Sequence, residues 1–231
     1  VIARILIPRI LLISLRKKLF DIPDDRKIHK RAIPRLGGVS FFPTTLFAFC
    51  LVYAFRLLDG DSISTLYASY LLPELLLFAC GMTLLYLTGI ADDLVGVRYR
   101  QKFAIQIFCA CLFPCRDLDK RFVRPVRHTR AFGLCRIPFT VLTVVFITNA
   151  INLIDGIDGL ASGLSSVALL VFTFLFISKG LWSYAMLSAG TFGVLVPFFY
   201  YNVFGSVERA RKIFMGDTGS LPWAIPSVSL P

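Results

Sequence analysis

Long apolar stretches, separated by shorter polar ones, are the main pattern along this chain of 231 residues. A helix needs about 20 mostly apolar residues to cross the hydrocarbon core of a membrane. Three stretches supply that length or nearly so, namely residues 39–55, 71–90 and 181–201. Three shorter ones complete the set, namely residues 103–114, 137–151 and 160–177. The pattern predicts an all-α fold, a polytopic transmembrane helix bundle with about six spans.

The composition places the chain in the same class. Hydrophobic residues make up 56% of it and 22 residues are Phe, which excludes an ordinary soluble domain. The first fifteen residues are also apolar but are broken by Arg4, Pro8 and Arg9. This is typical of the end of a helix that starts earlier, and not of a cleavable signal peptide. We therefore expect the bundle to be N-terminally incomplete and to lie in a lipid bilayer.

The distribution of Lys and Arg predicts the orientation of the bundle. Loops on the cytoplasmic side carry the excess of positive charge, and eight Lys and Arg residues fall between positions 16 and 35. With that loop inside, counting spans puts residues 92–102, 152–159 and 205–220 on the cytoplasmic side as well. Each of these loops carries aspartate, so we predict one shared polar site that faces the cytoplasm.

One segment contradicts this orientation. Residues 115–136 hold seven Lys or Arg against two Asp, yet span counting places them outside the cell. Their charges show neither aromatic interleaving nor a helical stripe, so we do not expect nucleic acid as a partner. We interpret residues 115–136, and the proline-containing residues 222–231, as products of a shifted reading frame, because codons can be chosen whose shifted reading is apolar. The expected domain is a single membrane-embedded unit over residues 1–221.

Polar residues that suit metal and phosphate chemistry lie in the predicted cytoplasmic loops. The run NAINLIDGIDG at residues 149–159 comes directly after an apolar stretch. Aspartate in such a place is costly and usually faces a polar cavity. The side chains of this run and of the last loop offer oxygen ligands that suit Mg²⁺, namely those of Asn152, Asp155, Asp158 and Asp217. Substrate phosphates commonly complete the coordination of Mg²⁺. With only two His in the chain, we do not expect a zinc site.

Each of these patterns has a simpler interpretation. Asp92 and Asp93 could merely end a span at the membrane interface, and residues 216–220 could form a turn before a helix. Residues 155–159 resemble half of a calcium loop but lack its acidic alternation and closing Glu. A transporter would place its acids near mid-span on discontinuous helices, whereas here they gather at one face.

Four motifs carry a resemblance to a known family. In chain order they are DIPDDRKIHKRAIPRLGG at residues 21–38, GIADDLVGVRYRQKF at 89–103, NAINLIDGIDGLASG at 149–163 and FMGDTGS at 214–220. With these motifs the chain resembles the polyprenyl-phosphate N-acetylhexosamine-1-phosphate transferases of glycosyl transferase family 4. The resemblance implies a Mg²⁺-dependent phosphotransferase, with Mn²⁺ as a substitute, in the bacterial cytoplasmic membrane. Undecaprenyl phosphate would attack the β-phosphate of a UDP-N-acetylhexosamine at the cytoplasmic face, and UMP would leave.

The resemblance also implies roles for individual residues. Asn152 and Asp217 match the metal positions of the family. Catalytic roles are implied for Asp92, Asp93, Lys102, Asp155 and Asp158, and substrate-binding roles for His29, Arg35, Asn202 and Phe214. Lys102 would neutralise phosphate charge. The paired aspartates would position the lipid phosphate instead of deprotonating it, because the second pKa of a phosphate is about 6.

The sugar and the activity of the chain have alternatives. The first-loop motif favours GlcNAc-1-phosphate, which would begin synthesis of a cell-envelope glycan, over the phospho-MurNAc-pentapeptide of peptidoglycan synthesis. Family members continue beyond FMGDTGS into further helices, so we expect the chain to be C-terminally incomplete, and an inactive truncated member is a second alternative. The expected partners are undecaprenyl phosphate, the UDP-sugar and the bilayer, with a homodimer as a further candidate.

Overall fold

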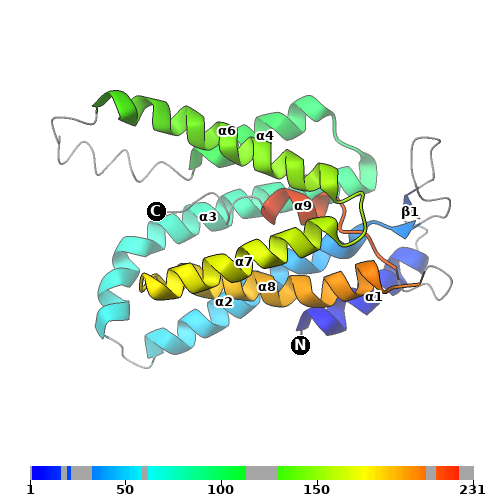
Figure 1. The fold of residues 1–231 in the computed structure, drawn as a ribbon, viewed down its shortest axis with the longest axis horizontal. Coiled ribbons are helices and arrows are strands. Elements are labelled where there is room, and N and C mark those ends of the chain that lie inside the picture. The colour runs from blue at the N-terminus through cyan, green and yellow to red at the C-terminus, as the bar shows by residue number, and fades with distance from the viewer. Residues whose placement is uncertain are drawn as a thin grey trace.

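The computed structural model describes residues 2–16, 20–21, 33–58, 62–112, 130–206 and 212–223. These residues form long helices that run along one axis of the molecule (Figure 1). The elements are α1 (Ile2–Arg16), β1 (Phe20–Asp21), β2 (Ile33–Pro34), the 3-10 helix η1 (Leu36–Ser40), α2 (Phe41–Leu58), α3 (Ser62–Val95), α4 (Tyr99–Leu112), α6 (Arg130–Ile154), α7 (Leu160–Ser178), α8 (Trp182–Val203) and α9 (Asp217–Trp223). The two strands have only two residues each and pair antiparallel. All the other elements are helices, so the described part of the chain is all-α in class, as predicted.

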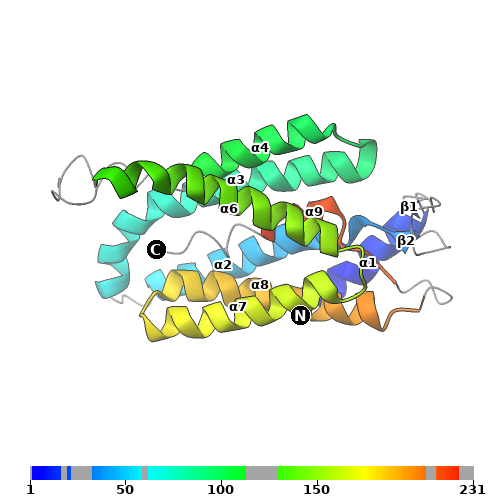
Figure 2. The ribbon, with the colours of Figure 1, turned by 45° about the horizontal axis from the view of Figure 1, so that its top comes forward.

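The helices pack in two groups (Figures 1 and 2). Helices α1, α2 and α7 pack against α8, whereas α3 and α6 pack against α4. The short helix α9 lies between the groups and contacts α3, α6 and η1. The connections from α3 to α4, from α6 to α7 and from α8 to α9 all lie at the same end of the bundle (Figure 1). These are the three acid-bearing loops, and their predicted convergence on one end is confirmed.

Each group of helices has its own apolar core. The first core joins α1, α2, α7 and α8 to the stretch before α9, and its members include Ile7, Phe41, Phe198, Ile213 and Met215. The second joins α3, α4, α6 and α9, and its members include Met82, Leu85, Cys109, Val144 and Leu221. Residues of the segment 213–221 thus belong to both cores, which fixes this segment between the two groups.

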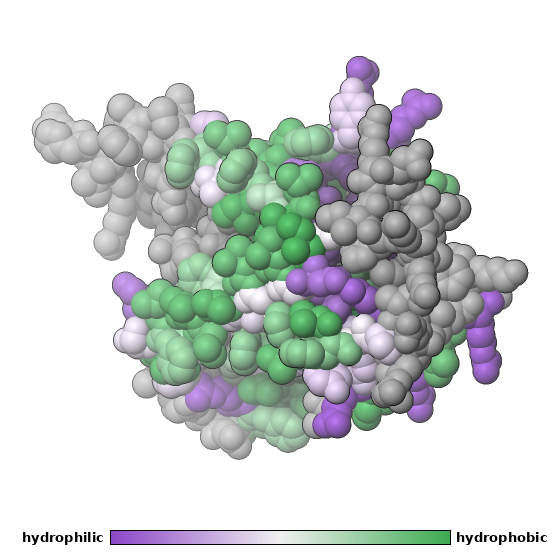
Figure 3. Space-filling model, turned by 45° about the vertical axis from the view of Figure 1, so that its right-hand side comes forward, coloured by the Kyte–Doolittle hydropathy of each residue, from purple (hydrophilic) through white to green (hydrophobic). Residues whose placement is uncertain are grey.

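The outer faces of the helices are apolar, as a bilayer requires. Large hydrophobic side chains are exposed along α2, α6 and α7, among them Phe47, Leu142, Phe146, Val167 and Phe174. Figure 3 shows hydrophobic residues over much of the described surface on one face of the molecule. Such a surface is unusual for a soluble monomer and is expected for a membrane protein.

All six predicted spans are helical, but their lengths differ. Four helices are long and apolar enough to cross a membrane, over Leu36–Leu58, Leu72–Val95, Leu160–Ser178 and Trp182–Val203. A shorter apolar helix covers Pro138–Ile154, and α4 has 14 residues. The helix that contains the predicted span 71–90 starts earlier than predicted, because residues 62–69 form the start of α3. Ser, Thr and Ala in this stretch are compatible with a helix, and the stretch has no Gly or Pro to end one.

The predicted frame-shifted segments lie mainly outside the described residues. Of residues 115–136, the structure describes 130–136 as the first part of α6, and of residues 222–231 it describes 222–223 as the end of α9. The shifted reading frame and the extent of the domain therefore stay predictions.

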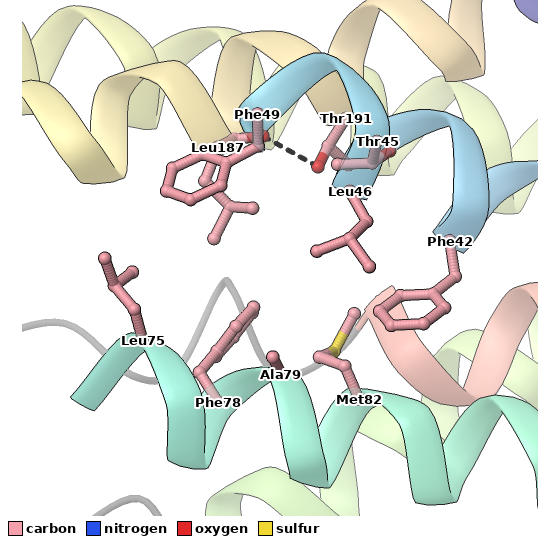
Figure 4. Close-up of a pocket in the computed structure, with 10 residues that line it drawn as sticks. All are labelled: Phe42, Thr45, Leu46, Phe49, Leu75, Phe78, Ala79, Met82, Leu187 and Thr191. Carbon is pink, nitrogen blue, oxygen red and sulfur yellow. Dashed lines mark hydrogen bonds between the residues drawn. The ribbon is translucent and has the colours of Figure 1, made fainter. Parts of the chain in front are cut away.

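An apolar pocket lies between α2, α3 and α8 (Figure 4). Its lining residues are Phe42, Thr45, Leu46, Phe49, Leu75, Phe78, Ala79, Met82, Leu187 and Thr191. The hydroxyl group of Thr191 donates to the Leu187 carbonyl oxygen at 2.8 Å. None of the lining side chains is ionisable, and Met82 lies about 15 Å along α3 from Asp92 at 1.5 Å per residue. The pocket is therefore separate from the polar site.

Candidate active site

The site begins with the way α9 is anchored. Asp93, near the end of α3, accepts the backbone N–H groups of Asp217 and Thr218 at 3.0 and 2.9 Å and the Thr218 hydroxyl at 2.6 Å. The first N–H groups of a helix lack partners within that helix, and a carboxylate is a favourable acceptor for them. Asp93 thus fixes the start of α9 and, with it, the position of Asp217.

The segment before α9 is held beside η1. Phe214 donates its N–H to the Pro34 carbonyl at 2.9 Å, and the Phe214 carbonyl accepts the Gly37 N–H at 3.0 Å. On the other side, Gly89 lets α3 approach α9: a Cβ atom at this position would lie 2.5 Å from the Thr218 Cα atom. A side chain at residue 89 would therefore push α9 away from α3.

Two side chains from different helices bond to the Asp217 carboxylate. Lys102, in the first turn of α4, bonds to both Asp217 and Asp92. Asn152, in the last turn of α6, donates its side-chain N–H to Asp217 Oδ1 at 2.6 Å and to the Ser220 hydroxyl at 2.8 Å. Residues that lie far apart in the sequence, on α3, α4, α6 and α9, are thus brought into direct contact.

The charges of Lys102 and Asp217 stabilise one another. Burial raises the pKa of Asp217, but its hydrogen bonds with Asp92, Lys102 and Asn152 outweigh burial and bring the pKa below its usual range. Burial lowers the pKa of Lys102, but its bonds to Asp217 and Asp92 outweigh this and raise it. At neutral pH the site therefore holds an ammonium group and an ionised carboxylate side by side.

Asp155 directly follows α6 and contacts the loop before α9. Its carboxylate accepts the Gly216 N–H at 3.2 Å. The pKa of Asp155 is raised to about 7. Burial is the main cause, and the neighbouring carboxylates of Asp217 and Asp93 add to it, whereas the Gly216 bond and the charge of Arg35 act in the opposite direction. Asp155 can therefore carry or release a proton near neutral pH.

Two further predicted residues hold the loops in place. Asp158 forms an ion pair with Lys212, a residue that the sequence did not single out. Asn202, which is buried, accepts the Gly159 N–H at 2.6 Å and donates to the Ile213 carbonyl at 3.0 Å. Its amide thus joins the loop before α7 to the segment before α9.

The predicted substrate-binding residues differ in their exposure to solvent. Arg35 is exposed beside the site, where its charge acts on Asp155, whereas Phe214 is largely buried. His29 lies outside the described residues. For Arg35, His29, Asn202 and Phe214, contact with a substrate stays a prediction.

The donor set fits Mg²⁺ only if other ligands complete it. Among the described residues, no group of three or more His, Cys, Asp or Glu side chains is placed to hold an ion. The predicted metal residues Asn152 and Asp217 are, however, in contact, so they can share one ion. Mg²⁺ in phosphate-transferring sites is often bound by one or two carboxylates, with water and substrate phosphates as the other ligands. The site fits that pattern, and Mg²⁺ itself stays a prediction.

These observations define a helical membrane protein with a cluster of carboxylate, amide and ammonium groups at one end of its bundle. Comparison with known proteins identifies the family. Residues 75–228 match the family described as glycosyl transferase family 4. The match covers more than half of the chain, and the chain belongs to this family.

Individual relatives cover nearly the whole chain. A probable undecaprenyl-phosphate N-acetylglucosaminyl 1-phosphate transferase of Bacillus subtilis (strain 168) is 32% identical over 94% of this chain and 56% of its own length. A phospho-N-acetylmuramoyl-pentapeptide-transferase of Thermoanaerobacter sp. (strain X514) is 31% identical over 84% of this chain and 58% of its own length. An undecaprenyl-phosphate alpha-N-acetylglucosaminyl 1-phosphate transferase of Yersinia pestis is 28% identical, over 90% and 53%. The chain spans about half the length of the curated relatives it matches.

Proposed function

We propose that the protein transfers a sugar 1-phosphate, most specifically GlcNAc-1-phosphate, from a UDP-sugar to undecaprenyl phosphate at the cytoplasmic face of the bacterial membrane. The observation that carries the proposal is the contact of Asp217 with both Lys102 and Asn152 at one end of an apolar bundle. A lipid phosphate can reach such a place from the bilayer, and a nucleotide sugar can reach it from water.

In the proposed reaction an oxygen of the lipid phosphate forms a bond to the β-phosphorus of the UDP-sugar. The bond from this phosphorus to the bridging oxygen breaks, and that oxygen leaves with UMP. Catalysis of phosphoryl transfer is mainly the positioning of reactants and the stabilisation of spreading negative charge. The lipid phosphate is mostly doubly ionised at pH 7, because its second pKa is about 6, so the reaction needs no strong base.

The residues of the site divide these tasks. Lys102, held as a cation, neutralises charge on the transferred phosphate. Asn152 and Asp217 would hold Mg²⁺, which supplies further neutralisation of the pyrophosphate when bound. Asp92 positions the lipid phosphate relative to Lys102, and Asp93 acts through the backbone of α9. Asp155 and Asp158 lie in the adjoining loop, where we place the nucleotide.

The orientation and the sugar rest on different observations. The excess of Lys and Arg between positions 16 and 35, together with the single end at which the acidic loops meet, supports a site that faces the cytoplasm. The first-loop motif and the name of the relative from Bacillus subtilis support GlcNAc. The name of the Thermoanaerobacter relative supports the MurNAc-pentapeptide alternative.

The test is UMP release by the purified chain in vesicles that contain undecaprenyl phosphate. We expect release with UDP-GlcNAc, little with UDP-MurNAc-pentapeptide, and at least a roughly 100-fold loss in Asp217→Asn. Thermal unfolding of the variant shows whether it is folded. Release only with UDP-MurNAc-pentapeptide would move the chain to the alternative substrate, and no release with either would identify an inactive member of the family.

A further inference from the structure

A pair of amide side chains, one buried and one partly buried, joins α4 to α6. Asn149 donates its side-chain N–H to Gln106 Oε1 at 2.7 Å and also to the Val145 carbonyl at 2.7 Å. Gln106 is 1% exposed. The two helices pack directly against each other, so the pair lies inside the contact between them and not on the lipid-facing surface.

The pair lies one helical turn away from two residues of the site. Gln106 follows Lys102 by four residues on α4, and Asn149 precedes Asn152 by three residues on α6. Residues three or four apart share one face of a helix and lie about 5–6 Å apart along it. Lys102 and Asn152 both bond to Asp217. The helices α4 and α6 therefore meet in two successive polar layers, one at Asp217 and one at the amide pair.

Stability alone does not account for this pair. The layer beyond it is apolar and includes Cys109, Ala110 and Val144, so apolar side chains would continue the core without a break. Gln106 Nε2 is buried without a hydrogen-bond partner in the described part of the chain, and an unsatisfied buried donor destabilises a fold. A hydrogen bond between side chains has, however, a narrow range of distance and angle, and a buried polar contact can fix the register of two helices.

We propose that Gln106 and Asn149 are positioning residues that fix α4 against α6 and thereby hold Lys102 at the correct distance from Asn152 and Asp217. A rotation or slide of α4 moves Lys102 directly, because Lys102 and Gln106 lie on the same face. Asn152 and Asp217 stay together, since they are joined by a bond of their own. The effect of losing the pair is thus a misplaced ammonium group. The expected effect on the rate of transfer rests on the proposed function. The expected effect on the position of Lys102 rests on geometry alone.

The test compares Gln106→Leu, Asn149→Leu and the double variant. Each single variant removes the bond between the two amides and leaves the other amide inside the helix contact, so both are expected to unfold at lower temperature than the wild type. In the double variant both polar groups are gone, and stability is expected to return. Transfer should remain roughly 10- to 100-fold slower in kcat, because the register is no longer fixed. The KM for the UDP-sugar should stay near the wild-type value. Gln101→Leu, an exposed glutamine on the same helix, is the matched control and should keep wild-type kcat.

A second readout does not depend on turnover. Acylation of lysine is slow for an ammonium group held between carboxylates, so mass spectrometry after brief amine labelling reports where Lys102 lies. In the double variant we expect labelling of Lys102 to rise by about threefold or more, while Lys212, paired with Asp158 elsewhere in the site, keeps its labelling. A double variant that regains wild-type kcat or shows unchanged Lys102 labelling overturns the proposal. If the wild type releases no UMP while the labelling of Lys102 rises as expected, the proposed function fails and the positioning role stands.

Discussion

Replacing Asp155 by Asn should make the protein more stable at pH 8, and to a smaller extent at pH 5. In the folded protein, burial raises the pKa of Asp155 to about 7, whereas an aspartate in an unfolded chain has a pKa of about 3.9. The folded state therefore binds the proton more tightly than the unfolded state. Its contribution to stability is present below pH 4, is lost as the pH rises from about 4 to 7, and levels off above 7.

The size of the effect follows from the two pKa values. A difference of about 3 pKa units corresponds to about 4 kcal/mol at 1.36 kcal/mol per unit. The residue is only partly buried, so water screens part of this, and we expect about 2 kcal/mol. Asn is uncharged at every pH, and its amide oxygen can still accept the Gly216 N–H that Asp155 accepts at 3.2 Å. For a chain of this size, about 2 kcal/mol corresponds to a rise in Tm of roughly 4–8 °C.

The assay is thermal unfolding in detergent from pH 5 to pH 8.5, with EDTA present so that only protons are exchanged. The difference in Tm between Asp155→Asn and the wild type should grow with pH and level off above pH 7. Asp158→Asn is the matched control: Asp158 belongs to the same loop but is exposed and paired with Lys212, so its variant should not gain stability at pH 8. A difference that stays constant with pH, or shrinks as the pH rises, would refute the reasoning.

Three further predictions concern the rest of the site. Gly89→Ala should destabilise the protein by roughly 2 kcal/mol or more and abolish transfer, because its Cβ atom would lie 2.5 Å from Thr218 Cα; thermal unfolding at wild-type level would contradict this. Lys102→Met should reduce kcat at least about 100-fold. The control is Lys179→Met, which changes an exposed lysine at the opposite end of α7 from the site and should leave kcat unchanged. Equal kcat values for the two variants would show that Lys102 has no part in the mechanism. EDTA should stop UMP release and Mg²⁺ or Mn²⁺ should restore it, and release that persists after exhaustive chelation would exclude a metal.

The sequence was sufficient to predict the apolar bundle and the meeting of three loops at one end. Both follow from local patterns, because span length and the positive-inside rule depend on composition along the chain. The predicted span begins at residue 71 and does not include the start of α3. Residues 62–69 are polar enough to resemble a loop, yet they belong to the same helix as the apolar residues that follow. Side-chain partners from distant positions, such as Lys212 with Asp158 and Gln106 with Asn149, leave no periodic signal in one sequence.

The division of work between Asp92 and Asp93 also follows from structure and not from the motif. Both residues lie in the last turn of α3, and neighbouring positions of a helix point about 100° apart. Asp92 therefore turns toward Lys102 and the Val97 N–H, whereas Asp93 turns toward the first turn of α9. One member of the pair bonds to Lys102, while the other holds the backbone that carries Asp217. Two adjacent aspartates thus have two separate structural roles, since one carboxylate pairs with Lys102 on α4 and the other fixes the start of α9.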